Sequence, residues 1–301
     1  MHVSGTSHLH PSTKGLLTAF ANVDPPTKRQ KAITPKLLRA MYKLSGAGST
    51  ALRDTPFAVI TEIAIVGFFF AMRSCEATTT PKPGRTRIID LDGVTFRDET
   101  NCIIPHTSAL LESAYRVTVT FADQKNKTKN DKRTQKHSGD TVLDPVRCLA
   151  SLVKRILATV PGACGSTTIN TMCLESDTFL LSSSYLRDQL RHSCTLMGGS
   201  ATFGFDATEI GTKSLRSGAA MALFLTDYST ARIMILGRWS SDAFLVYIRP
   251  QVLEWTNNMI RNDSFFDATD VPQADKDDSC AHRSLSFNGD RPIFPRLHLS
   301  H

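Results

Sequence analysis

The sequence predicts an α+β fold: a mostly helical domain with one small antiparallel β-sheet. Helix signals predominate, because most apolar segments have helical spacing and two of them begin at a capping residue followed by proline. Strand signals are confined to short β-branched segments that flank a basic turn. With 301 residues, 41% of them hydrophobic, the chain can bury one substantial core.

The helical segments share apolar residues at a helical period and are separated by residues that break helices. The first has Thr34 as its N-cap and Pro35 as its first residue, and the third has Asp144 as its cap. Gly237 ends the fifth. They are expected at 33–44, 57–72, 143–157, 212–225, 229–236, 240–248 and 250–260.

The strand segments are "GVTF" (93–96) and "YRVTVTF" (115–121), which alternate and are rich in β-branched residues. The basic run that follows is expected to form a hairpin turn, with "RTQKHS" (133–138) as the returning strand. These segments predict a small antiparallel sheet between the second and third helices.

Composition also predicts the domain boundaries. Residues 1–32 are polar and rich in Pro, Ser and Thr, so we expect a linker or the remnant of an N-terminal domain. Residues 33–262 are expected to form the folded domain. Residues 263–301 carry clustered aspartates and prolines and are expected to be a disordered tail.

The charge balance favours a polyanionic partner. Lys and Arg number 35 against 28 Asp and Glu, a net charge of +7. Six of these cations fall in "KNKTKNDKRTQKH" (125–137), where Asp131 is the one acid. A nuclear-localisation patch or a solvated turn remains an alternative to DNA contact for this run.

Several classes of protein are not expected. The seven scattered cysteines include no CxxC pair, which argues against a disulfide framework or zinc finger and fits a reducing compartment. The apolar run 57–71 contains Glu62 and is shorter than the roughly 20 residues of a spanning helix. No secretory leader opens the sequence. We therefore expect an intracellular protein, nuclear in a eukaryote, with no membrane contact, metal or cofactor.

Three short segments contain the arginines and the tyrosine on which the functional interpretation depends. They are "AMRSCE" (71–76), "KSLR" (213–216) and "LGRWSSDAFLVY" (236–247). In order and spacing they resemble the catalytic boxes of tyrosine recombinases of the phage integrase type, including those of eukaryotic mobile elements, over about residues 33–260. Each box alone is a weak signal, but three in order are specific.

The resemblance implies a role for each box residue. Arg73 and Arg216 would bind the phosphate under attack, and Tyr247, nine residues after Arg238, would be the nucleophile. Lys213 and Arg238 would complete the site. Glu76 would orient Arg73 or its neighbour. The fold would be that of DNA breaking-rejoining enzymes.

A lysine in the hairpin would be the general acid in this family, and Lys125 fits best. Lys127, Lys129 and Lys132 are close enough in sequence to compete for the role. These three lysines and Arg133 are also the residues that we expect to contact DNA.

The chemistry explains these residue types. Tyrosine has a pKa of about 10, so it attacks poorly at pH 7 unless its site favours the phenolate. Two guanidiniums can bind the non-bridging phosphate oxygens and hold the charge of the transition state without a metal. A lysine can protonate the leaving 5′-oxygen. The expected product is a 3′-phosphotyrosine.

The sequence departs from the family pattern in two respects. Lys213 stands where histidine is common, and Arg238 where histidine or tryptophan is usual; arginine can donate to a phosphate but cannot act as a base. Trp239 could supply an indole N–H if the turn is shifted by one residue. Family members usually carry a separate N-terminal helical domain, for which residues 1–32 are too short.

Three functions therefore remain open. The first is site-specific recombination or integration of double-stranded DNA. The second is a type IB topoisomerase-like activity, which shares the chemistry. The third is a catalytically decayed or domesticated DNA-binding protein. Locally, Tyr247 could be a packing aromatic, and Arg73 could complement a helix C-terminus.

Assembly is expected as a homo-tetramer on DNA. An apolar stripe follows the tyrosine at helical spacing and comprises Val252, Trp255, Met259 and Ile260. In the resembled family this helix often docks on a neighbouring subunit. Packing within its own subunit is the equal alternative.

Overall fold

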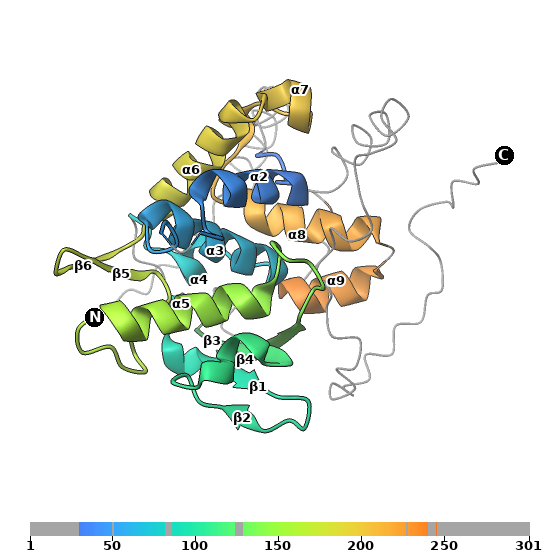
Figure 1. Cartoon of the computed structure of the whole chain (residues 1–301). Coiled ribbons are helices and arrows are strands. Elements are labelled where there is room, and N and C mark those ends of the chain that lie inside the picture. Colours follow the sequence, from blue (N-terminus) through green and yellow to red (C-terminus); the bar gives the residue numbers. More distant parts are fainter. Residues whose placement is uncertain are drawn as a thin grey trace, which may run out of the picture.

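The computed structural model describes residues 30–49, 51–81, 86–123, 129–226, 228–239 and 245. These residues confirm the predicted fold class, since helices surround one core and a small antiparallel sheet lies at one side (Figure 1). The predicted tail, Lys125, Lys127, Tyr247 and Trp255 lie outside the described residues.

The α-helices are α2 (Pro35–Ser45), α3 (Pro56–Phe69), α4 (Ser74–Ala77), α5 (Pro145–Thr159), α6 (Ser183–Leu196), α7 (Gly199–Phe203), α8 (Ser214–Leu225) and α9 (Thr230–Gly237). The described residues also form short 3-10 helices, η1 (Leu91–Gly93), η2 (Ala109–Ser113) and η3 (Ala207–Glu209).

α3 is the central helix of the core. It is buried from Ala58 to Phe69 and packs against α2, α5, α6 and α8. A helix that is apolar on every side needs partners on every side, which accounts for this position. α3 therefore ends inside the protein, at the place where the candidate site lies.

The main sheet has the strand order β2-β1-β3-β4, with every pair antiparallel. Its strands are β1 (Val94–Arg97), β2 (Ile103–Ile104), β3 (Arg116–Asp123) and β4 (Lys129–Lys136). Val117, Val119 and Phe121 alternate into the core along β3. The hairpin is present as predicted, but its returning strand spans Lys129–Lys136 and not 133–138, so part of the basic run that was expected to form the turn is strand.

The expected caps are confirmed. The Thr34 hydroxyl accepts a hydrogen bond from Leu37 N at 3.2 Å, and the Asp144 carboxylate accepts one from Arg147 N at 2.9 Å. The side chain of a cap residue satisfies an N–H that has no partner within the helix.

Several further features differ from expectation. The helix predicted to residue 72 ends at Phe69. A second, two-stranded sheet follows α5 and consists of β5 (Thr171–Leu174) and β6 (Asp177–Leu180). Gln30 to Ala32, placed in the predicted linker, lie against α8: Gln30 Oε1 accepts from Lys213 N at 3.0 Å, and Ala32 is buried.

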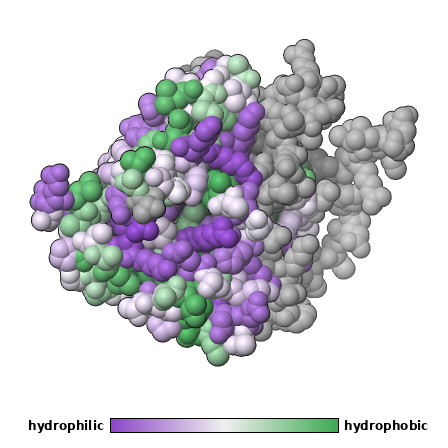
Figure 2. Space-filling view, in the orientation of Figure 1, coloured by the Kyte–Doolittle hydropathy of each residue, from purple (hydrophilic) through white to green (hydrophobic). Residues whose placement is uncertain are grey.

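The face seen in Figure 1 is mixed in character. A hydrophilic band runs along the outer side of α5, with apolar patches on either side of it (Figure 2). No helix in the described part of the chain is both long enough and apolar enough to cross a membrane.

Candidate active site

The site begins where α3 ends. Phe70 N donates to Val66 O, Ala71 N donates to Phe68 O at 3.1 Å, and Ala71 has a φ of 45°. This left-handed conformation is uncommon for a residue other than glycine. It stops the helix, so the carbonyls at its end and just beyond it have no partner within the helix.

These carbonyls accept hydrogen bonds from side chains far along the chain. Phe69 O accepts from Gln135 Nε2 at 2.9 Å. Ala71 O accepts from Arg216 at 2.7 Å and from Arg238 at 3.1 Å. Carbonyls at a helix C-terminus carry partial negative charge, and Ala71 O lies directly after that end, so arginines are favourable partners there.

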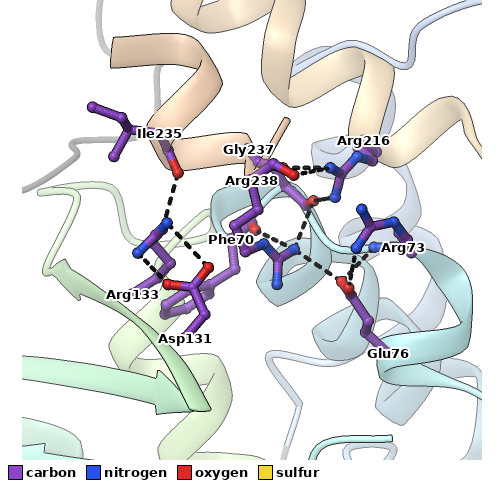
Figure 3. Close-up of polar contacts among 10 residues, drawn as sticks. Phe70, Arg73, Glu76, Asp131, Arg133, Arg216, Ile235, Gly237 and Arg238 are labelled. Carbon is purple, nitrogen blue, oxygen red and sulfur yellow. Dashed lines mark hydrogen bonds and ion pairs between the residues drawn. The ribbon is translucent and has the colours of Figure 1, made fainter. Parts of the chain in front are cut away.

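Arg73 is the N-cap of the short helix α4, and Glu76 lies in that helix. Glu76 Oε2 accepts from Arg73 N at 2.7 Å, and Glu76 Oε1 pairs with Arg73 Nη1 at 2.7 Å (Figure 3). The Glu76 side chain is 1% exposed, whereas that of Arg73 is 22% exposed. Glu76 therefore holds the Arg73 guanidinium while leaving it accessible to solvent.

Arg238 is the neighbour that Glu76 also binds. It follows α9 in a left-handed conformation, and its Nη2 pairs with Glu76 Oε2 at 2.8 Å. The guanidinium lies 3.4 Å from the centroid of the Phe121 ring, and the side chain is only 1% exposed. Arg238 thus points into the protein interior, with its guanidinium between Glu76 and Phe121.

The buried position has an electrostatic consequence. Burial lowers the pKa of Arg238 to about 10, while the Glu76 carboxylate opposes the change and Arg73 adds to it. Its Nε and Nη1 are buried without a hydrogen-bond partner in the described part of the chain. Glu76 therefore compensates a charge that the protein interior disfavours.

Arg216 lies in the first turn of α8 and reaches the end of α9. Its guanidinium donates to Gly237 O and, at 2.7 Å, to Ala71 O. It also lies 4.3 Å from the centroid of the Trp239 ring. A Cβ on Gly237 would fall 1.5 Å from Trp239 Cζ3, so the absence of a side chain at Gly237 allows this stack.

The remaining predicted residues fall into two groups. Lys213, the N-cap of α8, and Lys129 and Lys132 on β4 are exposed. Arg133, which we also expect to contact DNA, is partly buried and binds protein groups: it pairs with Asp131 at 2.6 Å and donates from Nε to Ile235 O at 3.0 Å.

The structure thus brings together Arg73 and Glu76 of α4, Arg216 of α8 and Arg238 after α9 (Figure 3). Trp239 stacks beside Arg216. Sequence reasoning missed Phe121 and Asp131 as parts of this cluster. Asp131 did give a signal, since it is the one acid within the basic run. The described residues include no group of three or more His, Cys, Asp or Glu side chains placed to hold a metal ion.

The chain matches no known family model and no curated protein. Among solved structures it is similar to XerH site-specific recombinase in a post-cleavage complex with palindromic difH substrate. The identity is 12% and the TM-score 0.47, and the match covers 77% of this chain and 54% of that chain. A pre-cleavage XerH complex with difH matches at 13% identity and a TM-score of 0.47, over 85% of this chain and 67% of that one. The chain therefore spans about half to two thirds of those chains.

Proposed function

We propose that this chain is the catalytic domain of a tyrosine recombinase that cleaves and rejoins DNA strands through a 3′-phosphotyrosine. The observation that carries the proposal is that residues of the three sequence boxes (71–76, 213–216 and 236–247) contact one another in the structure. Arg73 and Arg238 both pair with the Glu76 carboxylate. Arg216 donates to Ala71 O after α3 and to Gly237 O at the end of α9. A chance match of short patterns gives no reason for such a convergence.

In the proposed reaction the guanidiniums of Arg73 and Arg216 bind the non-bridging oxygens of the scissile phosphate. Tyr247 Oη attacks phosphorus, the bond from phosphorus to the 5′-oxygen breaks, and a hairpin lysine, Lys125 or a neighbour, protonates that oxygen. The guanidiniums stabilise the added charge of the transition state. No metal or cofactor takes part in these steps.

Arg238, the third-box residue that was expected to complete the phosphate site, has a different role in this proposal. Because it is buried against Glu76 and Phe121, we assign it as a positioning residue that holds Glu76, and through Glu76 holds Arg73. Trp239 lies beside Arg216. We assign its indole N–H as the third-box donor to the phosphate, in place of Arg238.

Double-stranded DNA is the proposed partner. Its phosphates would be contacted by the exposed lysines Lys129, Lys132 and Lys213. Assembly as a tetramer stays a prediction. Cleavage and rejoining at paired sites would require it, whereas a type IB topoisomerase-like enzyme would relax supercoiled plasmid without paired sites.

The burial of Arg238 also favours the decayed alternative in one respect, because it withdraws one possible phosphate donor from the surface. A decayed protein would bind duplex DNA without becoming attached to it. Plasmid relaxation and covalent trapping therefore separate the three functions.

The test uses a nicked suicide duplex, from which the 5′ fragment diffuses away after cleavage and leaves the protein trapped. We expect wild type to give a denaturation-resistant DNA adduct and Tyr247→Phe to give none while still binding DNA. Tyr228→Phe, just before α9, is the matched control and should form the adduct. An adduct formed by Tyr247→Phe would refute the assignment of the nucleophile.

A further inference from the structure

Arg133 joins the β3–β4 hairpin to the end of α9. Its Nε donates to Ile235 O at 3.0 Å, and its two amino groups bind the two oxygens of Asp131, at 2.6 Å and 3.2 Å (Figure 3). The Arg133 and Asp131 side chains are only 19% and 15% exposed. A two-point contact with a carboxylate fixes the plane of a guanidinium, so Asp131 orients Arg133 toward α9.

The acceptor belongs to the helix end that carries the third box. Ile235 lies in the last turn of α9, and its carbonyl also accepts from Arg238 N at 3.2 Å. Carbonyls at a helix C-terminus lack partners within the helix and attract cations. The Ile235 side chain is exposed, so the contact depends on this backbone group and not on apolar burial.

A second contact joins the hairpin to the end of α9, at the strand position opposite Asp131. The Phe121 ring on β3 stacks against the Arg238 guanidinium, and Phe121 is the cross-strand partner of Asp131. Both strands of the hairpin therefore contact the C-terminal end of α9, β4 through Ile235 and β3 through Arg238. Pairing continues beyond this level to Asp123 and Lys129, so the attachment sets the position of the paired part of the hairpin that the structure describes.

We infer that Arg133, oriented by Asp131, is a positioning residue for strand cleavage; the inference rests on the proposed function. It sets the distance between the hairpin that supplies the general acid and the turn that leads to Tyr247. In cleavage the Tyr247 oxygen bonds to phosphorus as the bond to the 5′-oxygen breaks, and that oxygen takes its proton from a hairpin lysine. A small displacement of the hairpin would slow the proton transfer selectively.

The test compares two suicide duplexes, one with the normal 5′-oxygen at the scissile bond and one with sulfur in its place. A thiolate leaves without protonation, so the sulfur duplex does not need the general acid. We expect Arg133→Gln to slow adduct formation about 10²-fold on the oxygen duplex and by less than about threefold on the sulfur duplex. Asp131→Asn should act in the same direction, with a smaller loss.

The matched control is Arg232→Gln, which removes one positive charge from the exposed face of α9 without touching the contact. It should behave as wild type on both duplexes. Asp131→Asn is nearly isosteric and serves as the second variant if Arg133→Gln melts early.

Two results overturn the inference: Arg133→Gln cleaving the oxygen duplex at the wild-type rate, or losing activity equally on both duplexes. The second result would mean that Arg133 supports the whole site and not the acid. Failure of wild type to form a Tyr247 adduct on either duplex would instead refute the proposed function, and with it this inference.

Discussion

Glu76 holds the arginine cluster together, and its replacement by leucine should destabilise the fold strongly. The carboxylate is 1% exposed and contacts both Arg73 and Arg238. Arg73 is partly exposed, so water can solvate it after the change. Arg238 is 1% exposed and cannot be solvated without unfolding, so most of the loss falls on Arg238.

The magnitude follows from the buried charge. Removing one partner of a buried ion pair costs about 3–5 kcal/mol, because the other charge stays buried and unpaired. Burial already lowers the pKa of Arg238 to about 10 with Glu76 in place, so the charged form is disfavoured from the outset. Domains are stable by only about 5–15 kcal/mol, and Glu76→Leu should therefore remove a large share of the free energy of unfolding.

A double-mutant cycle separates this pair from general damage to the core. Urea unfolding is measured for wild type, Glu76→Leu, Arg238→Met and the double variant. Replacing both partners of a buried pair by apolar residues is often tolerated, so the double variant should be more stable than the sum of the single losses predicts, by about 2 kcal/mol or more.

The exposed pair Lys154–Glu112, with side chains 35% and 58% exposed, provides a control cycle with an expected coupling of about 0.2–1 kcal/mol. If the losses at Glu76 and Arg238 add to within about 0.5 kcal/mol, the two side chains do not depend on each other and the reasoning is wrong.

Two further predictions concern α3 and the turn after α9. Burial raises the pKa of Glu62 to about 8, against the hydrogen bond from Ser151 and the charge of Arg155. The folded state therefore keeps its proton while the unfolded state loses it above about pH 4.3. The destabilisation by Glu62 grows from there to about pH 8, so urea unfolding should show Glu62→Gln to be more stable than wild type at pH 7.5 and equal to it near pH 4; a difference independent of pH would contradict this. Gly237→Ala should displace the Trp239 ring from Arg216, since the new Cβ would fall 1.5 Å from Cζ3. Indole fluorescence in a Trp255→Phe background should shift, and an unchanged spectrum would count against the stack.

Local signals predicted the parts of the fold that depend on neighbouring residues. Thr34 with Pro35 and Asp144 with Pro145 marked two helix starts, because a cap bond joins residues three positions apart. α6 was not predicted, although Leu186, Leu190 and Cys194 recur four residues apart after the Ser182 cap. The signal for α6 was therefore present in the sequence.

Tertiary contacts decided what the sequence could not show. The apolar run continues through Phe70 to Met72, so hydrophobic pattern alone extends the helix to residue 72. The helix ends earlier because Ala71 takes a left-handed conformation. The Ala71 carbonyl accepts hydrogen bonds from Arg216 and Arg238 in that conformation. Those arginines lie more than 140 residues further along the chain, beyond the reach of any local pattern.

The left-handed turn at Arg238 bears on the proposed function. The turn directs two consecutive side chains differently: Arg238 lies buried against Glu76 and Phe121, and Trp239 lies beside Arg216. An indole donates one hydrogen bond and accepts none, so under the proposed function it could bind a phosphate oxygen but could not take the proton of Tyr247. Arg238 cannot take it either, because its pKa of about 10 keeps it protonated at neutral pH. The proposed chemistry in this chain therefore depends on binding the phosphate and protonating the leaving oxygen, and not on a histidine base in the third box.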